Sequence, residues 1–158
     1  ENCTMDYKKA LNLAASLCSK KEYCCDDIRK KLLAWEITPE DCSRILDFLQ
    51  KNRFIDEARF ASFYARDKFR FNRWGMKKIN LMLRQKGIPS DIVRNALATL
   101  NASEYETTCL SLLKQKYRSL HDRDKLQTKA KLFRFCLSRG FDYETIQRCY
   151  DLLKKQKE

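Results

Sequence analysis

Apolar residues recur along this chain at intervals of three and four positions, and no segment shows a sustained alternation with period two. Spacing of i, i+3 and i+4 places apolar side chains on one face of a helix, so the pattern predicts an all-α protein. The expected helices lie near residues 6–19, 25–35, 39–51, 57–70, 74–86, 89–100, 104–118, 124–139 and 143–155. With 3 glycines and 2 prolines, the chain has too few turn formers for an all-β fold.

The same helical pattern occurs three times. Ile37, Ile88 and Phe141 each follow an amphipathic run and precede another, at offsets of 51 and 53 residues. These offsets also align Ile28 with Ile79 and Leu132, Leu32 with Leu83 and Cys136, Cys42 with Val93 and Ile146, Leu46 with Leu97 and Tyr150, and Leu49 with Leu100 and Leu153. The sequence therefore predicts three tandem three-helix repeats, called below the first (1–53), second (54–101) and third (102–158) repeat. Stacked repeats form an elongated, curved body, an architecture typical of binding proteins.

Helix ends are marked by short polar residues and by glycine. N-caps are expected at Thr38, Asp56 and Asp142, a capping box at Ser103–Glu106, and left-handed helix ends at Gly87 and Gly140. In the helix expected at 57–70 and just after it, the spacing assigns Phe60, Phe63, Tyr64 and Phe71 to the core. Phe69 and Trp74 lie off this stripe and are the aromatic residues expected to stack on a base or a partner.

Positive charge is concentrated in two segments. The chain has 33 basic and 21 acidic residues, a net charge of +12. Eight basic residues accompany one acid between Arg66 and Lys86, and nine accompany two acids between Lys114 and Arg139. Both segments fall at the same place in their repeats. This doubled concentration favours a polyanionic partner over a merely solvated helix face.

Eight cysteines are present, but they indicate neither a metal site nor a disulfide framework. No Cys-x-x-Cys occurs and His121 is the single histidine, so clustered zinc ligands are missing. No apolar stretch approaches the roughly 20 residues needed to cross a bilayer, and no signal peptide is recognised. We expect a reduced, cytoplasmic protein with no metal and no cofactor, whose cysteines pack as small apolar side chains.

Specific residues of the second repeat resemble one known family. They are Phe54–Ala61 (FIDEARFA), Tyr64, Trp74-Gly75, Lys78-Ile79, Leu83 and Lys86-Gly87-Ile88, and the first repeat adds Leu17–Tyr23 (LCSKKEY), Ile28 and Leu32. This pattern resembles the RecX family of recombination regulators over about residues 9–153. The chain departs from that family at Asn52-Arg53, where glycine is frequent, and at Cys24, where serine is usual.

The resemblance implies three tandem three-helix units and a non-enzymatic regulatory function. It implies binding to the RecA recombinase filament and modulation, most simply inhibition, of its ATPase, strand-exchange and coprotease activities. The partners it implies are RecA and the single-stranded DNA within the filament, with weak direct binding to DNA. It implies no association with a membrane and a monomeric protein.

The basic segments supply the expected contact residues. We predict DNA or filament binding by residues that combine positive charge with a position outside the apolar stripes. They are Arg66, Lys68, Arg70, Arg73, Trp74, Lys77 and Arg84 in the second repeat and Lys125, Lys129 and Arg134 in the third. The sequence predicts no catalytic residue.

Two other functions remain open from the residues. A free-standing DNA-binding module would insert a helix of a three-helix unit into a groove, yet Asn80 and Gln85 are the only amides near the basic residues, which favours backbone contact over base reading. An enzyme is disfavoured, because the chain has no glycine-rich phosphate loop and no paired acids in an expected cleft.

Overall fold

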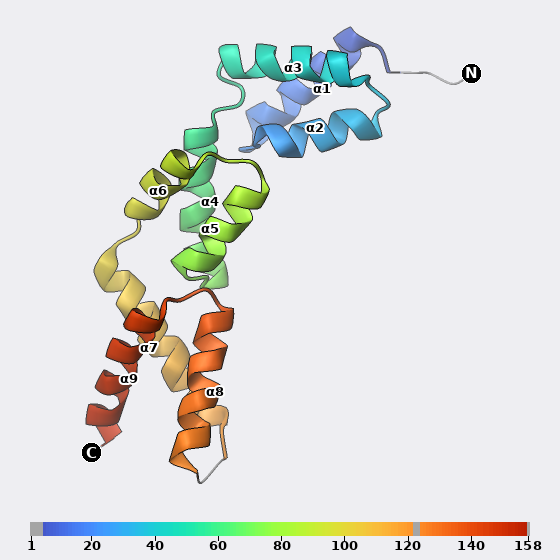
Figure 1. Cartoon of the computed structure of the whole chain (residues 1–158). Helices are drawn as coiled ribbons and strands as arrows, with labels where there is room; N and C mark the ends of the chain where they lie inside the picture. Colours follow the sequence, from blue (N-terminus) through green and yellow to red (C-terminus); the bar gives the residue numbers. More distant parts are fainter. Residues whose placement is uncertain (1–4, 122–123, 158) are drawn as a thin grey trace. The chain divides into compact units, whose positions relative to one another are not determined.

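The computed structural model describes residues 5–121 and 124–157; Cys3, Asp122 and Arg123, counted above, lie outside this part. Within it the chain forms nine α-helices and no strand, which confirms the all-α prediction (Figure 1). The helices are α1 (Tyr7–Lys20), α2 (Cys25–Ala34), α3 (Pro39–Lys51), α4 (Glu57–Asn72), α5 (Met76–Gln85), α6 (Ser90–Ala98), α7 (Ala102–Ser119), α8 (Lys125–Ser138) and α9 (Tyr143–Lys157). Each of these described helices is too short or too polar to cross a bilayer.

The chain divides into two compact units. The first combines the described part of Glu1–Phe63 with Leu83–Val93, and the second combines Tyr64–Met82 with the described part of Arg94–Glu158. In the first unit, α1, α2 and α3 pack on one another, and in the second, α7 packs against α8 and α9. Helices α4 and α5 each contribute to both units. The repeat boundaries after residues 53 and 101 stay a prediction.

Most of the expected caps are confirmed by hydrogen bonds. The side chains of Thr38, Asp56 and Asp142 accept from the N–H groups three residues further on, at 3.3, 3.0 and 2.9 Å. The capping box expected at Ser103 is wrong, because α7 begins at Ala102, two residues earlier than expected. Asn101 caps it by accepting from the Glu104 N–H at 3.0 Å. Asn and Ser cap equally well, so composition alone does not decide between two nearby candidates.

The second helix of each repeat ends in the same way. Glu36, Gly87 and Gly140 occupy equivalent positions and have φ angles of 62°, 80° and 97°. The N–H of the following residue then bonds back to a carbonyl five residues earlier. These bonds run from Ile37 to Leu32 (3.0 Å), from Ile88 to Leu83 (3.1 Å) and from Phe141 to Cys136 (3.1 Å). The first repeat therefore adopts the glycine-type helix end without a glycine, at the steric cost that a Cβ imposes in this region.

Most of the apolar positions aligned by the repeat are buried, whereas Leu97 and Tyr150, which align with the buried Leu46, are half-buried. Three aligned residues of each repeat, two on its middle helix and one at or just after the end of its third helix, have at most 9% of their surface exposed. They are Ile28, Leu32 and Leu49, then Ile79, Leu83 and Leu100, then Leu132, Cys136 and Leu153. Ile37, Ile88 and Phe141 are buried too, so each helix end directs an apolar side chain into the core.

The core face of α4 differs from the expected aromatic stripe. Phe69 is 7% exposed, whereas Phe63 and Phe71 are 51% and 76% exposed. The buried face also includes Ala61 and Ala65, both fully buried. Phe60, at 5% exposed, is buried as expected, so the expected stripe is confirmed there and wrong at Phe63 and Phe71.

The cysteines serve as packing residues. Cys18, Cys24, Cys25, Cys42, Cys109, Cys136 and Cys149 are free in the described part of the chain. Cys109, Cys136 and Cys149 are fully buried where α7, α8 and α9 pack together, and the Cys149 Sγ lies 3.4 Å from the Glu106 carbonyl. They fill positions that would accept aliphatic residues of similar size, as expected.

Candidate nucleic-acid interface

The first turn of α5 is held by the third repeat, within the second compact unit. A helix start leaves N–H groups without partners inside the helix. Here three consecutive N–H groups find partners in the segment between α8 and α9 and on α7. Gly75 donates to the Arg139 carbonyl (2.7 Å), Met76 to the Tyr105 hydroxyl (3.0 Å) and Lys77 to the Gly140 carbonyl (2.9 Å). The backbone that carries the basic residues of α5 is thus fixed in place.

Two glycines make this approach possible. A Cβ on Gly75 would overlap the backbone of Gly140 and Phe141, and a Cβ on Gly140 would overlap the Cβ of Lys78. Gly140 also needs its left-handed backbone, with φ at 97°. Close contact between two backbones therefore holds the corner between α4 and α5 against the α8–α9 segment.

Trp74 sits at this corner with two lysines over its ring. The ammonium groups of Lys68 and Lys78 lie 5.3 and 4.6 Å from the ring centroid, and Tyr64 meets the ring edge-on at 6.4 Å. Cation–π contacts of this kind contribute roughly 0.5–1 kcal/mol each at exposed sites. The half-buried Trp74 ring therefore contacts two ammonium groups, one from α4 and one from α5.

The remaining predicted residues of the second repeat divide between the two compact units. Arg66, Arg70, Arg73 and Lys77 are exposed and belong to the second unit, near the start of α5 in sequence. Arg84 belongs to the first unit, where its guanidinium donates to the Ile88 carbonyl at 3.3 Å. The structure therefore brings four of these five residues into one unit and gives Arg84 a local role at a helix end.

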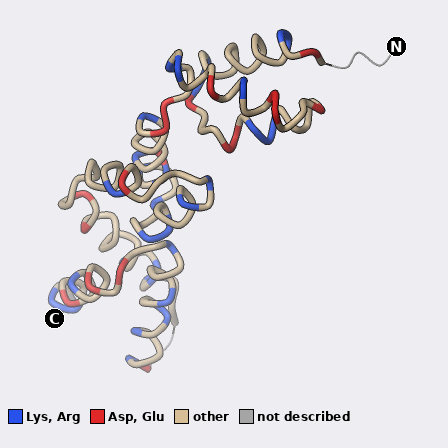
Figure 2. Tube along the Cα trace, turned by 45° about the horizontal axis from the view of Figure 1, so that its top comes forward, with Lys and Arg blue, Asp and Glu red and all other residues tan. Residues whose placement is uncertain are grey.

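The predicted residues of the third repeat all lie on α8. Lys125 and Arg134 are exposed. Lys129 lies over two aromatic rings, with its Nζ 5.4 Å from the Phe133 centroid and 5.3 Å from that of Tyr150. Figure 2 marks Lys and Arg in blue, and blue segments recur along both α5 and α8.

Two basic residues of α7 were not among the predicted contacts. Lys114 and Arg118 line an open groove along this helix, together with Arg73 at the end of α4. Their spacing of four residues, following hydroxyls at Thr107 and Ser111, was visible in the sequence. It was missed because the predicted contacts were placed on the middle helix of the third repeat rather than on the first.

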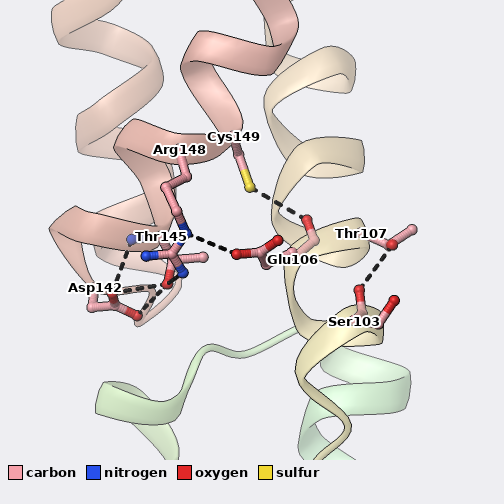
Figure 3. Close-up of polar contacts among 7 residues, drawn as sticks. All are labelled: Ser103, Glu106, Thr107, Asp142, Thr145, Arg148 and Cys149. Carbon is pink, nitrogen blue, oxygen red and sulfur yellow. Dashed lines mark hydrogen bonds and ion pairs between the residues drawn. The ribbon is translucent and has the colours of Figure 1, made fainter.

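Polar contacts join α7 to α9 and cap the start of α9 (Figure 3). The Arg148 guanidinium donates to the Glu106 carboxylate at 2.8 Å, and the Thr145 hydroxyl contacts Asp142 at 2.8 Å. Burial opposes ionisation of Asp142, but the hydrogen bonds from the Thr145 N–H and hydroxyl outweigh it, so the pKa of this carboxyl lies below its ordinary value. Asp142 therefore stays charged and keeps α9 capped over the physiological range.

In the first unit, residues at and just before the start of α2 contact residues of the second repeat, and here side chains make the contacts. Lys86 pairs with Asp27 at 2.8 Å and Arg59 pairs with Glu22 at 2.6 Å. The Cys25 N–H donates to the Glu57 carboxylate at 3.3 Å. Burial raises the pKa of Asp27, but the hydrogen bond from Lys86 outweighs this effect, so the pKa lies below its ordinary value.

The described side chains offer no group of three or more His, Cys, Asp or Glu arranged to hold a metal ion. Chemically, the arrangement presents exposed guanidinium and ammonium groups on a fixed helical scaffold. Such groups bind anions, and phosphate above all, by charge-assisted hydrogen bonds.

Comparisons with known proteins agree on one family. A family model described as "RecX, second three-helix domain" matches residues 56–97, and one described as "RecX, third three-helix domain" matches residues 104–150. A "Regulatory protein RecX" from Prosthecochloris aestuarii is 32% identical over 150 residues, which are 94% of this chain and 95% of that protein. One from Clostridium perfringens is 30% identical over 120 residues, 75% of this chain but 56% of the relative. The chain thus spans little more than half the length of several relatives.

Solved structures share the fold. A "Crystal structure of regulatory protein RecX" matches with a TM-score of 0.84 and 23% identity, over 92% of this chain and 71% of that one. The structure of RecX from Lactobacillus salivarius matches with a TM-score of 0.81 and 24% identity, over 94% of this chain and 96% of that one. At this identity the likeness concerns the fold alone.

Proposed function

Because this chain belongs to the RecX family, we propose that it is a non-enzymatic regulator that binds the RecA nucleoprotein filament and lowers its ATPase, strand-exchange and coprotease activities. Its partners in this proposal are the recombinase subunits and the single-stranded DNA that they enclose. The protein acts as a cytoplasmic monomer. The relatives are named regulatory proteins, which supports a regulatory function.

One structural observation supports this proposal most strongly. The α4–α5 corner presents exposed Arg70, Arg73 and Lys77, and its backbone is fixed by the hydrogen bonds from Gly75 and Lys77 to the α8–α9 segment. A fixed scaffold lets several cations meet phosphates without first being ordered, so less conformational entropy is lost on binding. Positive groups at fixed positions suit a filament, whose charges repeat along its length.

The test reverses these charges. Replacing Arg70, Arg73 and Lys77 together by Glu should abolish inhibition of the ATPase of RecA filaments on single-stranded DNA. The matched control reverses Lys8, Lys20 and Arg29, three exposed residues of the first unit, and makes the same change in net charge. Circular dichroism checks that both variants fold. Unchanged inhibition by the folded corner variant would remove this assignment of the contact residues.

A free-standing DNA-binding module predicts a different result. Tight, sequence-selective footprints on naked duplex, with no effect on RecA filaments, would support that alternative. The proposed regulator instead protects no particular sequence, since its cations contact phosphates and not base edges.

A further inference from the structure

A continuous groove follows one side of α7 in the second unit. It consists of three adjoining hollows of about 340, 560 and 220 Å³. The first two share Arg73 and Thr107, and the last two share Lys114 and Arg118. Since neighbouring hollows have residues in common, they adjoin one another along the helix from Ser103 to Arg118. At 1.5 Å per residue, this length is about 22 Å.

Cations and neutral hydrogen-bonding groups line this groove. The cations are Arg70, Arg73, Lys114 and Arg118. Hydroxyl and amide groups lie between them, from Ser103, Thr107, Thr108, Ser111 and Gln115. Glu104 is the one carboxylate among the described lining residues, and it lies in the first hollow only. The part of the groove from Arg73 to Arg118 is therefore positive throughout.

The four cations are not arranged for the stability of the fold. Lys114 and Arg118 are four residues apart on one helix, where like charges repel and destabilise by a few tenths of a kcal/mol. No ion pair joins any of the four to a carboxylate in the part of the chain that the structure describes. Concentrated positive charge that the fold does not neutralise is suited to an external anion.

Arg73 is placed in the groove by an unfavourable backbone conformation. Its φ is 55°, in the left-handed region that costs a residue with a Cβ roughly 1 kcal/mol. Glycine would adopt this conformation without that cost. Arg73 also lines both the first and the second hollow, so this residue lies where the two meet. Glu36 and Arg53 follow helices with the same backbone, so the helix end accounts for the conformation, and the position of Arg73 between two hollows is what indicates a binding role.

We propose that this groove binds the sugar–phosphate backbone of single-stranded nucleic acid, with Arg73, Lys114 and Arg118 contacting successive phosphates. The inference rests on the proposed function and adds the site through which this chain contacts the strand directly. A shallow, open groove along one helix can accommodate one strand, whereas a duplex is read by elements that protrude into its own grooves. The neutral hydroxyls and amide donate to phosphate oxygens, as such side chains do in other nucleic-acid complexes.

The test measures fluorescence anisotropy of a labelled oligothymidine strand with the isolated full chain, over a series of salt concentrations. Replacing Lys114 and Arg118 by Gln should weaken binding about tenfold or more at low salt, and should reduce the salt slope by about 1.4, since each lost phosphate contact on a single strand contributes about 0.7. The control replaces Lys20 and Arg29 by Gln, with the same loss of charge in the first unit, and keeps wild-type binding and slope.

Two results would overturn the inference. One is unchanged strand binding and slope in the folded groove variant. The other is that the wild-type groove binds polyglutamate but not the strand, which would assign it to an acidic protein segment.

Co-sedimentation with RecA filaments separates this inference from the proposed function. If the wild-type chain joins filaments while the groove variant binds naked strand normally, the groove assignment falls and the regulator remains. If the groove variant loses strand binding while the wild type never joins filaments, the groove assignment remains and the proposed regulation of RecA falls.

Discussion

Lys86 and Arg139 occupy equivalent positions in the second and third repeats, yet each contacts the preceding repeat through different atoms. Lys86 uses its ammonium, 2.8 Å from the Asp27 carboxylate. Arg139 uses its backbone carbonyl, which accepts from the Gly75 N–H at 2.7 Å. The same position thus forms an ion pair in the first unit and a backbone hydrogen bond in the second. The two contacts should respond differently to salt, pH and substitution.

The ion pair should make stability depend on pH and on salt. The pKa of Asp27 in the folded chain lies below its ordinary value. The ion pair therefore stabilises the fold fully above the pKa that Asp27 has in the unfolded chain, and this stabilisation is lost as the pH falls through the lower pKa of the folded chain. We expect Asp27→Asn to reduce the acid-induced loss of stability, and Lys86→Gln to cost about 1 kcal/mol at neutral pH and less in high salt. Urea unfolding across pH and salt measures both effects, and a Lys86→Gln cost independent of salt would contradict the assignment.

The backbone contact should be sensitive to a single methyl group. Gly140→Ala should destabilise the chain by about 3 kcal/mol, because it combines the left-handed cost with overlap on Lys78. Gly87→Ala is the matched control. Its φ is also positive, at 80°, but no atom lies within 4 Å of the added Cβ, so about 1 kcal/mol is expected. Equal losses in thermal unfolding would show that the Gly75–Gly140 approach contributes nothing.

Arg73 should separate stability from binding. Arg73→Gly removes the left-handed strain and should raise the unfolding free energy by up to about 1 kcal/mol, while weakening binding to single-stranded DNA. Arg53 has nearly the same backbone, with φ at 59°, but lies outside the groove. Arg53→Gly should therefore stabilise the chain equally and leave binding unchanged. Parallel calorimetry and anisotropy on the two variants give the comparison, and equal binding losses would argue against a role for Arg73 in the groove.

The thiols near the start of α2 should react slowly. Burial raises the pKa of Cys18 and of Cys24 to about 11 and that of Cys25 to about 12. The thiolate is the reactive form, so these residues are almost wholly unreactive at neutral pH. Mass spectrometry after brief treatment with iodoacetamide should show little alkylation of the folded chain and rapid alkylation in urea. Fast labelling of native Cys18 would contradict the burial of this site.

The sequence predicted most of the fold because the repeat provided the same information three times. Ile28, Ile79 and Leu132 align and are all fully buried. The aromatic residues of α4 were assigned from the second repeat alone, and the assignment was partly wrong. Phe71 was expected in the core and is exposed, whereas Phe69 is buried. The choice depended on which helix packs against α4, which no local pattern contains.

The candidate site was predictable in composition but not in arrangement. Charge density identified Arg70 and Arg73 correctly as exposed residues of one basic region. It did not identify Lys114 and Arg118, because the groove depends on how α4 lies against α7. Nor did it show that Arg84 belongs to the other compact unit. Tertiary packing determined each of these differences.

The proposed binding of this chain to RecA filaments can be measured by co-sedimentation with RecA assembled on single-stranded DNA, with ATP hydrolysis followed on the same samples. We expect the wild-type chain to pellet with the filament and to lower the ATPase rate in proportion to the amount bound. A chain that stays in the supernatant and leaves hydrolysis unchanged would contradict it.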